Sequence, residues 1–123
     1  MPNEHKLLGA FGEDAAQQYL RRHGYKIIGR NFLCRFGEID IIAQKGKYLA
    51  FVEVKMRKSA NFAAAREFVT PAKQRRVIAA AEYWLLKNPT KRQPRFDVVE
   101  VYAPEGLKTQ KPEINHIEDA YQL

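Results

Sequence analysis

The sequence predicts an α/β protein in which helices flank a mixed β-sheet. Two observations predict it: apolar residues recur at helical spacing in residues 7–23 and 71–87, and they alternate as in strands between and after these segments. The expected order is helix, three strands, helix and strand, with a possible extra strand at residues 114–117. Residues 95–102 carry apolar side chains on both faces, which fits a sheet covered on both sides. The chain length suits one domain, residues 1–123.

The first helix is expected to run from Leu7 to His23, and Gly24 is a natural stop. Its informative residue is Glu13, which falls at the border of the apolar stripe rather than opposite it. A carboxylate at this place is either an ordinary rim residue or a group that leans over the sheet. The segment that follows, residues 25–32, is predicted to be the first strand.

The second helix has a strong start, because Thr70 can cap it and Pro71 suits the first helical position. It is expected to end near Lys87, ahead of Asn88-Pro89. Its first turns are crowded with cations that oppose the helix dipole, so helix stability alone does not account for them. They either contact phosphates or form a solvated basic face. These cations are Lys73, Arg75 and Arg76.

The two central strands, residues 36–44 and 48–56, are predicted to form a hairpin around Lys45-Gly46-Lys47. If the turn contains an even number of residues, alternation of side chains gathers the charged groups on one face, whereas a bulge would break the alignment. The charged face then holds Glu38, Asp40, Glu53 and Lys55, and the other face holds Ile39, Ile41, Val52 and Val54. Three crowded carboxylates need a counter-ion, and a divalent metal would supply one and also act as a catalyst.

Mg²⁺ suits such a site, because it prefers hard oxygen ligands, one or two carboxylates and retained waters, and we expect Mn²⁺ to substitute for it. Asp40 and Glu53 are expected to bind the ion directly, joined by the backbone carbonyl of Val54. Glu13 would contact the metal directly or through a water, and Lys55 would orient the attacking water or stabilise transition-state charge. The alternative is a cross-strand lattice of salt bridges on an exposed sheet face. The role of Glu38 stays open.

The net charge of +7 and the pI of about 9.6 point to a polyanionic partner, most simply nucleic acid. A basic, alanine-rich segment, residues 57–66, follows the hairpin and is either a loop or the start of a short helix. Loops beside a rigid site often carry substrate contacts. The residues expected to contact nucleic acid are Arg35, Arg57, Lys58, Arg66, Lys73, Arg75 and Arg76.

Other classes of protein are poorly supported by the sequence. The single cysteine, Cys34, excludes an internal disulfide framework and is compatible with a reducing compartment. No apolar run approaches the ~20 residues of a membrane span, and the N-terminus lacks a signal-peptide pattern, so we expect a cytoplasmic protein without a membrane partner. The scattered histidines make no zinc pattern, and no phosphate-binding glycine motif occurs, so no small-molecule substrate is expected.

These residues resemble a known pattern. Gly12-Glu13, Gly37-Glu-Ile-Asp40 and Phe51-Val-Glu-Val-Lys-Met-Arg57 resemble the PD-(D/E)XK nuclease superfamily. More closely they resemble the small bacterial family UPF0102, or YraN, which is similar to Holliday-junction resolvases. Asn31-Phe32, the helix containing Lys73, the strand at residues 95–99 and residues 114–120 extend the resemblance over nearly the whole chain. Ile39 stands where the superfamily name has Pro, and Phe62-Ala63 stands where Phe-Gly is expected.

The resemblance implies a restriction-endonuclease-like fold with an αβββαβ core. It also implies that Asp40, Glu53 and Lys55 occupy the active-site positions, with Glu13 as an added carboxylate. The expected activity is then metal-dependent cleavage of DNA, selective for branched structures such as Holliday junctions. A resolvase must cut two opposed strands, which implies a homodimer. The alternatives are a non-catalytic nucleic-acid-binding module on the same scaffold, or a nuclease for RNA or for simple DNA ends and flaps.

Overall fold

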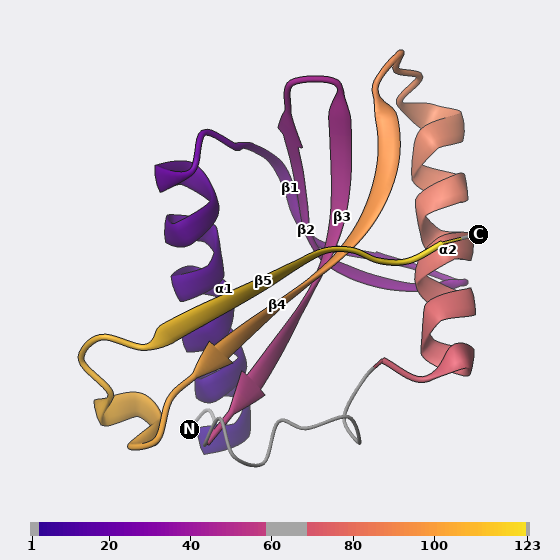
Figure 1. Cartoon of the computed structure of the whole chain (residues 1–123). Coiled ribbons are helices and arrows are strands. Elements are labelled where there is room, and N and C mark those ends of the chain that lie inside the picture. The colour runs from indigo at the N-terminus through magenta and orange to yellow at the C-terminus, as the bar shows by residue number, and fades with distance from the viewer. Residues whose placement is uncertain (1–2, 59–68, 123) are drawn as a thin grey trace.

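The computed structural model describes residues 3–58 and 69–122 and confirms the predicted α/β order, including the extra strand near the C-terminus (Figure 1). Within these ranges no helix is long and apolar enough to cross a lipid bilayer. The elements are α1 (Glu4–Arg22), β1 (Lys26–Cys34), β2 (Gly37–Lys45), β3 (Tyr48–Arg57), α2 (Pro71–Lys87), β4 (Gln93–Tyr102), the 3₁₀ helix η3 (Gly106–Lys108) and β5 (Glu113–Tyr121).

The strands form one open sheet in the order β1-β2-β3-β4-β5. Every neighbouring pair is antiparallel except β3 and β4, which are parallel. Parallel neighbours need a crossover connection, and α2 lies in it. This mixed sheet with a parallel central pair is consistent with the restriction-endonuclease-like core that the sequence predicts.

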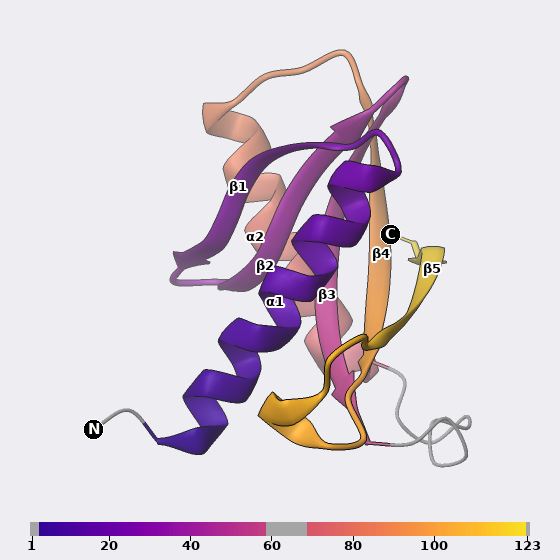
Figure 2. The same cartoon turned by 90° about the vertical axis from the view of Figure 1, so that its left-hand side faces the viewer.

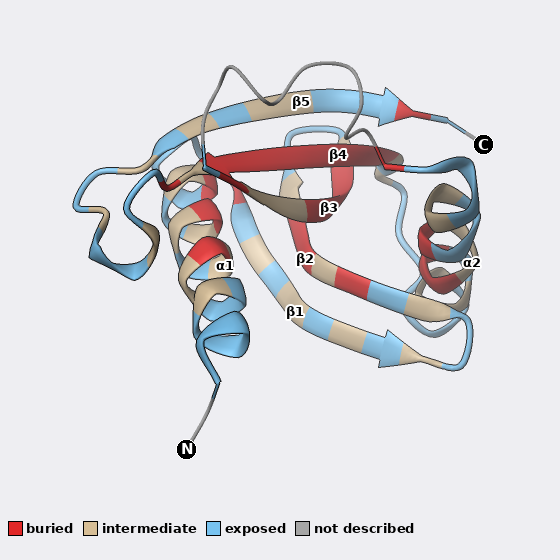
Figure 3. Cartoon of the chain, turned by 90° about the horizontal axis from the view of Figure 1, so that it is seen from below, coloured by how far each residue is buried: buried red, intermediate tan, exposed pale blue. Residues whose placement is uncertain are grey.

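The two helices cover opposite faces of the sheet and create two separate cores (Figures 2 and 3). Beneath α2, Phe51 stacks on Phe96, and Phe96 stacks on Tyr121, with ring centroids 5.7 and 5.3 Å apart. Beneath α1, Ala16 and Leu20 of the helix pack on small and branched side chains. This second core contains Ile41, Ala43, Ala50, Val52, Val99 and Val101.

Both helices begin where a side chain caps them. The Asn3 side chain accepts a hydrogen bond from the Lys6 amide at 2.8 Å, which starts α1 three residues earlier than the apolar pattern predicts. The Thr70 hydroxyl accepts one from the Lys73 amide at 3.2 Å, so α2 begins at Pro71 as predicted. The direction in which each α2 side chain points is therefore fixed from its first turn.

Two glycines allow the helices to approach the central strands closely. A Cβ on Gly12 of α1 would overlap the Met56 sulfur of β3, and one on Gly37 of β2 would lie 3.0 Å from the backbone oxygen of Arg76 in α2. Such close approach is available only to glycine. The first contact brings the residue after Gly12, Glu13, to the edge of the sheet, and the second presses the start of β2 against the basic turns of α2.

A buried polar cluster joins β4 to β5 on the side of α1. Asp97, which is fully buried, accepts two hydrogen bonds from Arg95, at 2.9 and 2.8 Å, and a third from the His116 ring at 2.8 Å. A fourth comes from the Asp119 amide at 3.0 Å, where β5 bulges out of register with β4. Burial alone would raise the pKa of Asp97, but the hydrogen bonds from His116, Arg95 and the Asp119 amide hold it below its ordinary value.

We expect Asp97→Asn to destabilise the fold by about 3 kcal/mol at pH 7, because it removes the buried carboxylate that pairs with Arg95 and leaves the exposed Glu118 as the ion-pair partner. The lowered pKa means that the contribution of Asp97 is complete above its unfolded value of about 4 and is lost as the pH falls through the lower folded-state value. Urea unfolding of wild type and variant should therefore converge at acidic pH. Glu113→Gln, an exposed change on β5 outside this cluster, is the control, and a difference that persists unchanged at acidic pH would contradict this account.

Candidate active site

The candidate site lies where β2 parts from β3. A two-residue turn, Gly46-Lys47, sets Lys45 opposite Tyr48, which confirms the even turn required by the sequence prediction. The ladder continues in register as far as Ile41 opposite Val52 and then ends. Asp40 is the next residue on β2 and Glu53 the next on β3, so their carboxylates meet at the point of separation.

The prediction that Ile39 lies on the same face of the sheet as Ile41 and Val52 is wrong. Ile39 belongs to the core beneath α2, whereas Ile41 and Val52 belong to the core beneath α1. Strict alternation would place Ile39 with Ile41. The strand is irregular at Asp40, which has no register partner on β1, and the facing residue Asn31 has a left-handed backbone with φ of 54°. This local irregularity aims Asp40 at β3.

Asp40 and Glu53 form a pair of crowded, largely buried carboxylates. Asp40 Oδ2 accepts a hydrogen bond from the Val54 amide at 2.8 Å, and Glu53 is only 6% exposed. Burial, followed by the Glu53 charge, raises the pKa of Asp40 to about 7, even though the Val54 amide opposes the shift. Burial likewise raises the pKa of Glu53, against the opposing influence of Lys73 and Lys55.

Two lysines face this pair. Lys73, on the first turn of α2, places its Nζ 3.7 Å from Glu53 Oε1. Lys55 lies two residues after Glu53 on β3, on the same face, and stands opposite Glu100 of β4. Sequence reasoning gave Lys73 only a phosphate contact, because no strand pattern reveals which helix residue will reach the carboxylates. The Thr70-Pro71 helix start was the signal that fixed where Lys73 points.

Glu13 lies at the border of α1, as predicted, and is held by a residue that the sequence analysis did not identify. Arg30 of β1 places its Nε 3.4 Å from Glu13 Oε1 and an Nη 2.8 Å from Asp14 Oδ1. The Glu13 charge still contributes to the raised pKa of Asp40, as does the charge of Glu38, which is exposed. Glu13 therefore acts on the site electrostatically while its carboxylate is paired with Arg30.

Apart from Lys73, the residues predicted to contact phosphates differ in their exposure. Arg35 and Lys58 are exposed near the two ends of the site strands, and Arg75 and Arg76 are exposed on α2. Arg66 lies outside the described residues. The side chain of Arg57 is 7% exposed, and its Nε donates to Glu100 Oε2 at 3.2 Å, so it belongs to an internal ion pair, and its contact with nucleic acid stays a prediction.

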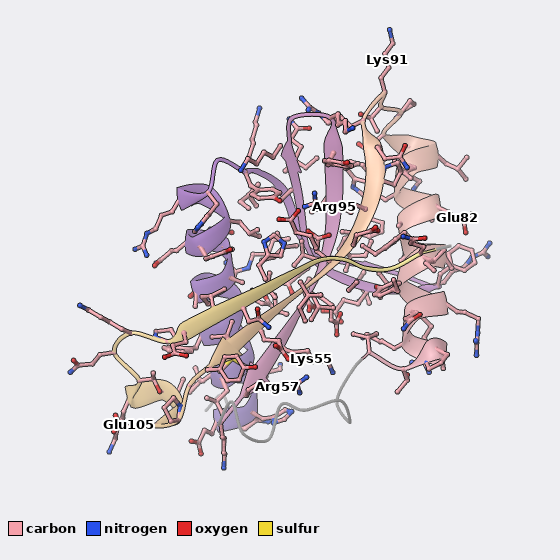
Figure 4. All side chains as sticks on the ribbon, in the orientation of Figure 1. Lys55, Arg57, Glu82, Lys91, Arg95 and Glu105 are labelled. Carbon is pink, nitrogen blue, oxygen red and sulfur yellow. The ribbon has the colours of Figure 1, made fainter. Side chains whose placement is uncertain are left out.

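Arg57 nevertheless belongs to the surroundings of the site. It follows Lys55 by two residues on the same face of β3, and Figure 4 shows the two side chains in one region of that strand, away from Arg95. Glu100, which fixes Arg57, also accepts hydrogen bonds from Tyr102 and Asn115, at 3.0 and 2.8 Å. Despite its burial, these donors and Arg57 lower the pKa of Glu100, so a fixed negative charge stands opposite Lys55.

The donor set has the chemistry that Mg²⁺ accepts, although residues 3–58 and 69–122 contain no three Asp, Glu, His or Cys side chains close enough to hold an ion alone. Mg²⁺ needs only one or two carboxylates because it keeps several waters. Asp40 and Glu53 supply two. A strand residue turns its N–H and carbonyl toward the same neighbour, so the Val54 carbonyl faces the gap in which its amide meets Asp40.

Tyr121 is a further member of this region that the sequence analysis did not identify. It lies on the α2 side of the sheet, 9% exposed, and its hydroxyl has no hydrogen-bond partner among the described residues. Burial raises the pKa of this phenol, and the charge of Glu53 raises it further. A buried hydroxyl without a partner is costly, so Tyr121 offers a free donor near the carboxylates. No sequence signal marks it, because it lies beyond the edge strand expected at residues 114–117.

Comparison with known proteins gives a consistent family relationship. Residues 12–101 match the model of a family described as "Uncharacterised protein family UPF0102". A UPF0102 protein of Geobacter sulfurreducens is 45% identical over 122 residues, which cover 98% of this chain and 93% of that protein. A UPF0102 protein of Clostridium perfringens is 41% identical over 124 residues, the full length of both chains. The matched region includes Glu13, Asp40, Glu53, Lys55 and Lys73.

We expect the metal-free protein to lose stability as the pH rises from about 5 to about 8. Folding raises the pKa of Asp40 to about 7. The contribution of Asp40 to the free energy of unfolding is therefore fully present below its unfolded-state pKa of about 4 and is lost as the pH rises through about 7. In EDTA, Asp40→Asn should remove most of this dependence and exceed wild type by about 1–2 kcal/mol at pH 8. Urea unfolding at both pH values measures it, with the exposed Glu82→Gln as control. A variant less stable than wild type at pH 8 would contradict the crowding of carboxylates.

Proposed function

This chain belongs to the uncharacterised protein family UPF0102, and we propose that it is a metal-dependent DNA endonuclease that hydrolyses phosphodiester bonds, selectively in branched DNA. The observation that carries the proposal is the pairing of Asp40 with Glu53 at the end of the β2–β3 ladder, with Lys73 at 3.7 Å from Glu53. Perturbed carboxylates beside lysines are typical of catalytic sites rather than of a surface salt-bridge lattice.

A divalent ion, Mg²⁺ or Mn²⁺, would be held by Asp40, Glu53 and the Val54 carbonyl, with Glu13 contributing directly or through a water. Such an ion supplies neutralisation of the scissile phosphate and a water of lowered pKa. The energetics of the two carboxylates also support binding of a divalent ion. Two adjacent buried carboxylates are unfavourable without a cation, and Lys73 alone, 37% exposed, gives only partial compensation.

The remaining residues have roles that follow from their positions. Lys55 projects on the same face as Glu53 and would orient the attacking water or stabilise the charge that develops on the phosphate. Lys73 would contact a phosphate oxygen from α2, next to the carboxylates. Arg76, exposed one turn after Lys73, would bind a flanking phosphate, as would the exposed Arg75, Lys58 and Arg35. Glu100 holds Arg57 in an internal ion pair.

A nucleic acid is favoured as substrate by the net charge of +7 and by the exposed cations around the site, and the choice of DNA follows from the family resemblance. Cleavage of two opposed strands at a junction would require two copies of the site, and therefore a homodimer. A non-catalytic binding module would not need buried carboxylates with raised pKa values, which cost stability. A nuclease for RNA or for simple ends and flaps would use the same site, so substrate preference has to be measured.

We expect the protein to cut a four-way DNA junction in Mg²⁺ or Mn²⁺ and to be inactive in EDTA. Asp40→Asn should lower the rate by about 10²–10³-fold or more, because it removes a charge that fixes the ion. Gel assays on junction, duplex, flap, single-stranded DNA and RNA measure both activity and preference. Glu82→Gln, on the side of α2 that points away from the sheet in Figure 4, is the matched control. Binding without cleavage of any of the five substrates would instead favour the binding-module alternative.

Lys55→Ala should abolish turnover while leaving Mn²⁺ affinity, measured by calorimetry, largely intact. The reason is that Lys55 would act on the water or the phosphate rather than on the metal. Lys47→Ala, an exposed lysine at the turn of the same hairpin, should cut at the wild-type rate. If Lys55→Ala still turns over normally, Lys55 is not a catalytic residue.

A further inference from the structure

We infer that the β1–β2 turn and the neighbouring edge of α2 form a surface that holds unstacked bases at a DNA branch. This branch surface consists of Leu33 near the end of β1, Arg35 and Phe36 of the turn, and Tyr83 and Lys87 of α2. The inference rests on the proposed function, because it names the feature of branched DNA that the same site would select.

The exposed apolar side chains of the turn are not explained by folding. Leu33 is 75% exposed and Phe36 is 38% exposed. Arg35 and Phe36 occupy both central positions of a tight hairpin turn, where Gly, Asn and Asp are favoured. Large apolar groups at the tip of a hairpin cost solvation without adding to either core, so they point to a bound partner.

The surroundings of these side chains indicate the chemistry of that partner. The Phe36 ring lies 5.7 Å from the Tyr83 ring, centroid to centroid. The Arg35 guanidinium lies 4.8 Å from the centroid of Phe36, and the Lys87 ammonium lies 4.6 Å from that of Tyr83. Alternation of aromatic rings with cations is the arrangement that binds unpaired nucleotides, because the rings stack on bases while the cations meet phosphates.

One stripe of α2 connects the branch surface to the carboxylates. Lys73, Arg76 and Tyr83 fall within about 80° of one another around the helix at ~100° per residue. Lys73 pairs with Glu53, the backbone of Arg76 lies against Gly37, and the ring of Tyr83 contacts the ring of Phe36. The stripe from Lys73 to Tyr83 is ten residues, about 15 Å at 1.5 Å per residue, which matches the rise of about four base pairs.

A second copy of the chain is the competing occupant of this surface. Two observations favour DNA. Arg35, Arg76 and Lys87 surround the apolar residues, and pairing this surface with the same surface of a second copy would bring like charges together. The surface also continues through Arg76 to the site at which the phosphodiester would be cut. A face used only for dimerisation would have no reason to be continuous with the carboxylates.

The test uses the full-length protein in EDTA, so that it does not depend on cleavage. The probe is a four-way junction with 2-aminopurine at the branch, compared with a duplex of equal length that carries 2-aminopurine at the matching position. Wild type should raise the fluorescence of the junction but not of the duplex. Phe36→Ser should weaken junction binding by at least about 10-fold, the range of one base–aromatic stack. Leu33→Ser removes an apolar contact and should weaken it several-fold, and both variants should leave duplex binding within about 2-fold.

Leu86→Ser is the matched control, because Leu86 is 81% exposed on the same helix but outside the stripe. Circular dichroism establishes that each variant is folded, and Leu33→Ser is the less disruptive of the two. Junction preference retained by both variants would overturn the inference. So would sedimentation showing that either variant converts a wild-type dimer to a monomer, which would assign the surface to a second copy. Absence of cleavage in Mg²⁺ would count against the proposed function only, since the fluorescence judges the branch surface separately.

Discussion

Asp40 and Glu53 stand side by side with most of their surrounding water removed, and the neighbouring elements each contribute a group that moderates the repulsion. The Val54 amide binds Asp40, Lys73 approaches Glu53 from α2, and Lys55 follows on the same strand. The close contact of Gly37 with Arg76 brings α2 near enough for this, and the parallel pairing of β3 with β4 buries Glu53. The repulsion between Asp40 and Glu53 is therefore set by three features of the fold: the crossover connection, the close contacts at glycine and the irregularity of β2.

The contrast with Asp97 shows that this conflict is not a general property of the fold. Both Asp97 and Asp40 lie in the sheet, and in each case the effect of burial, taken alone, is to raise the pKa. Asp97 receives four hydrogen bonds and has its pKa lowered, whereas Asp40 receives one from the described residues and has its pKa raised. The first is a satisfied structural group. The second keeps acceptor capacity that the described residues leave unfilled, which is what a ligand-binding carboxylate requires.

Local rules account for what the sequence could predict. The helices follow from periodicity and from the Thr70-Pro71 cap, and the meeting of Asp40 with Glu53 follows from a two-residue turn that fixes register. Ile39 was misplaced because alternation fails at an irregular strand residue, which leaves no mark in the sequence. The ion pair of Arg57 could not be predicted because its partner, Glu100, lies 43 residues away on another strand. Lys73 and Tyr121 reach the site through the packing of whole elements, which periodicity does not describe.

The parallel pairing of β3 with β4 also has a consequence for the order in which the protein matures. The β2–β3 hairpin is local and can form early, so Asp40 and Glu53 become neighbours soon after they leave the ribosome. Their burial waits for contacts of much greater sequence separation, since α2 and β4 must first be made and docked. A nascent or truncated chain therefore presents two solvated carboxylates in place of an assembled centre. The buried arrangement of Asp40 and Glu53 is completed late, when nearly the whole chain has folded around the hairpin.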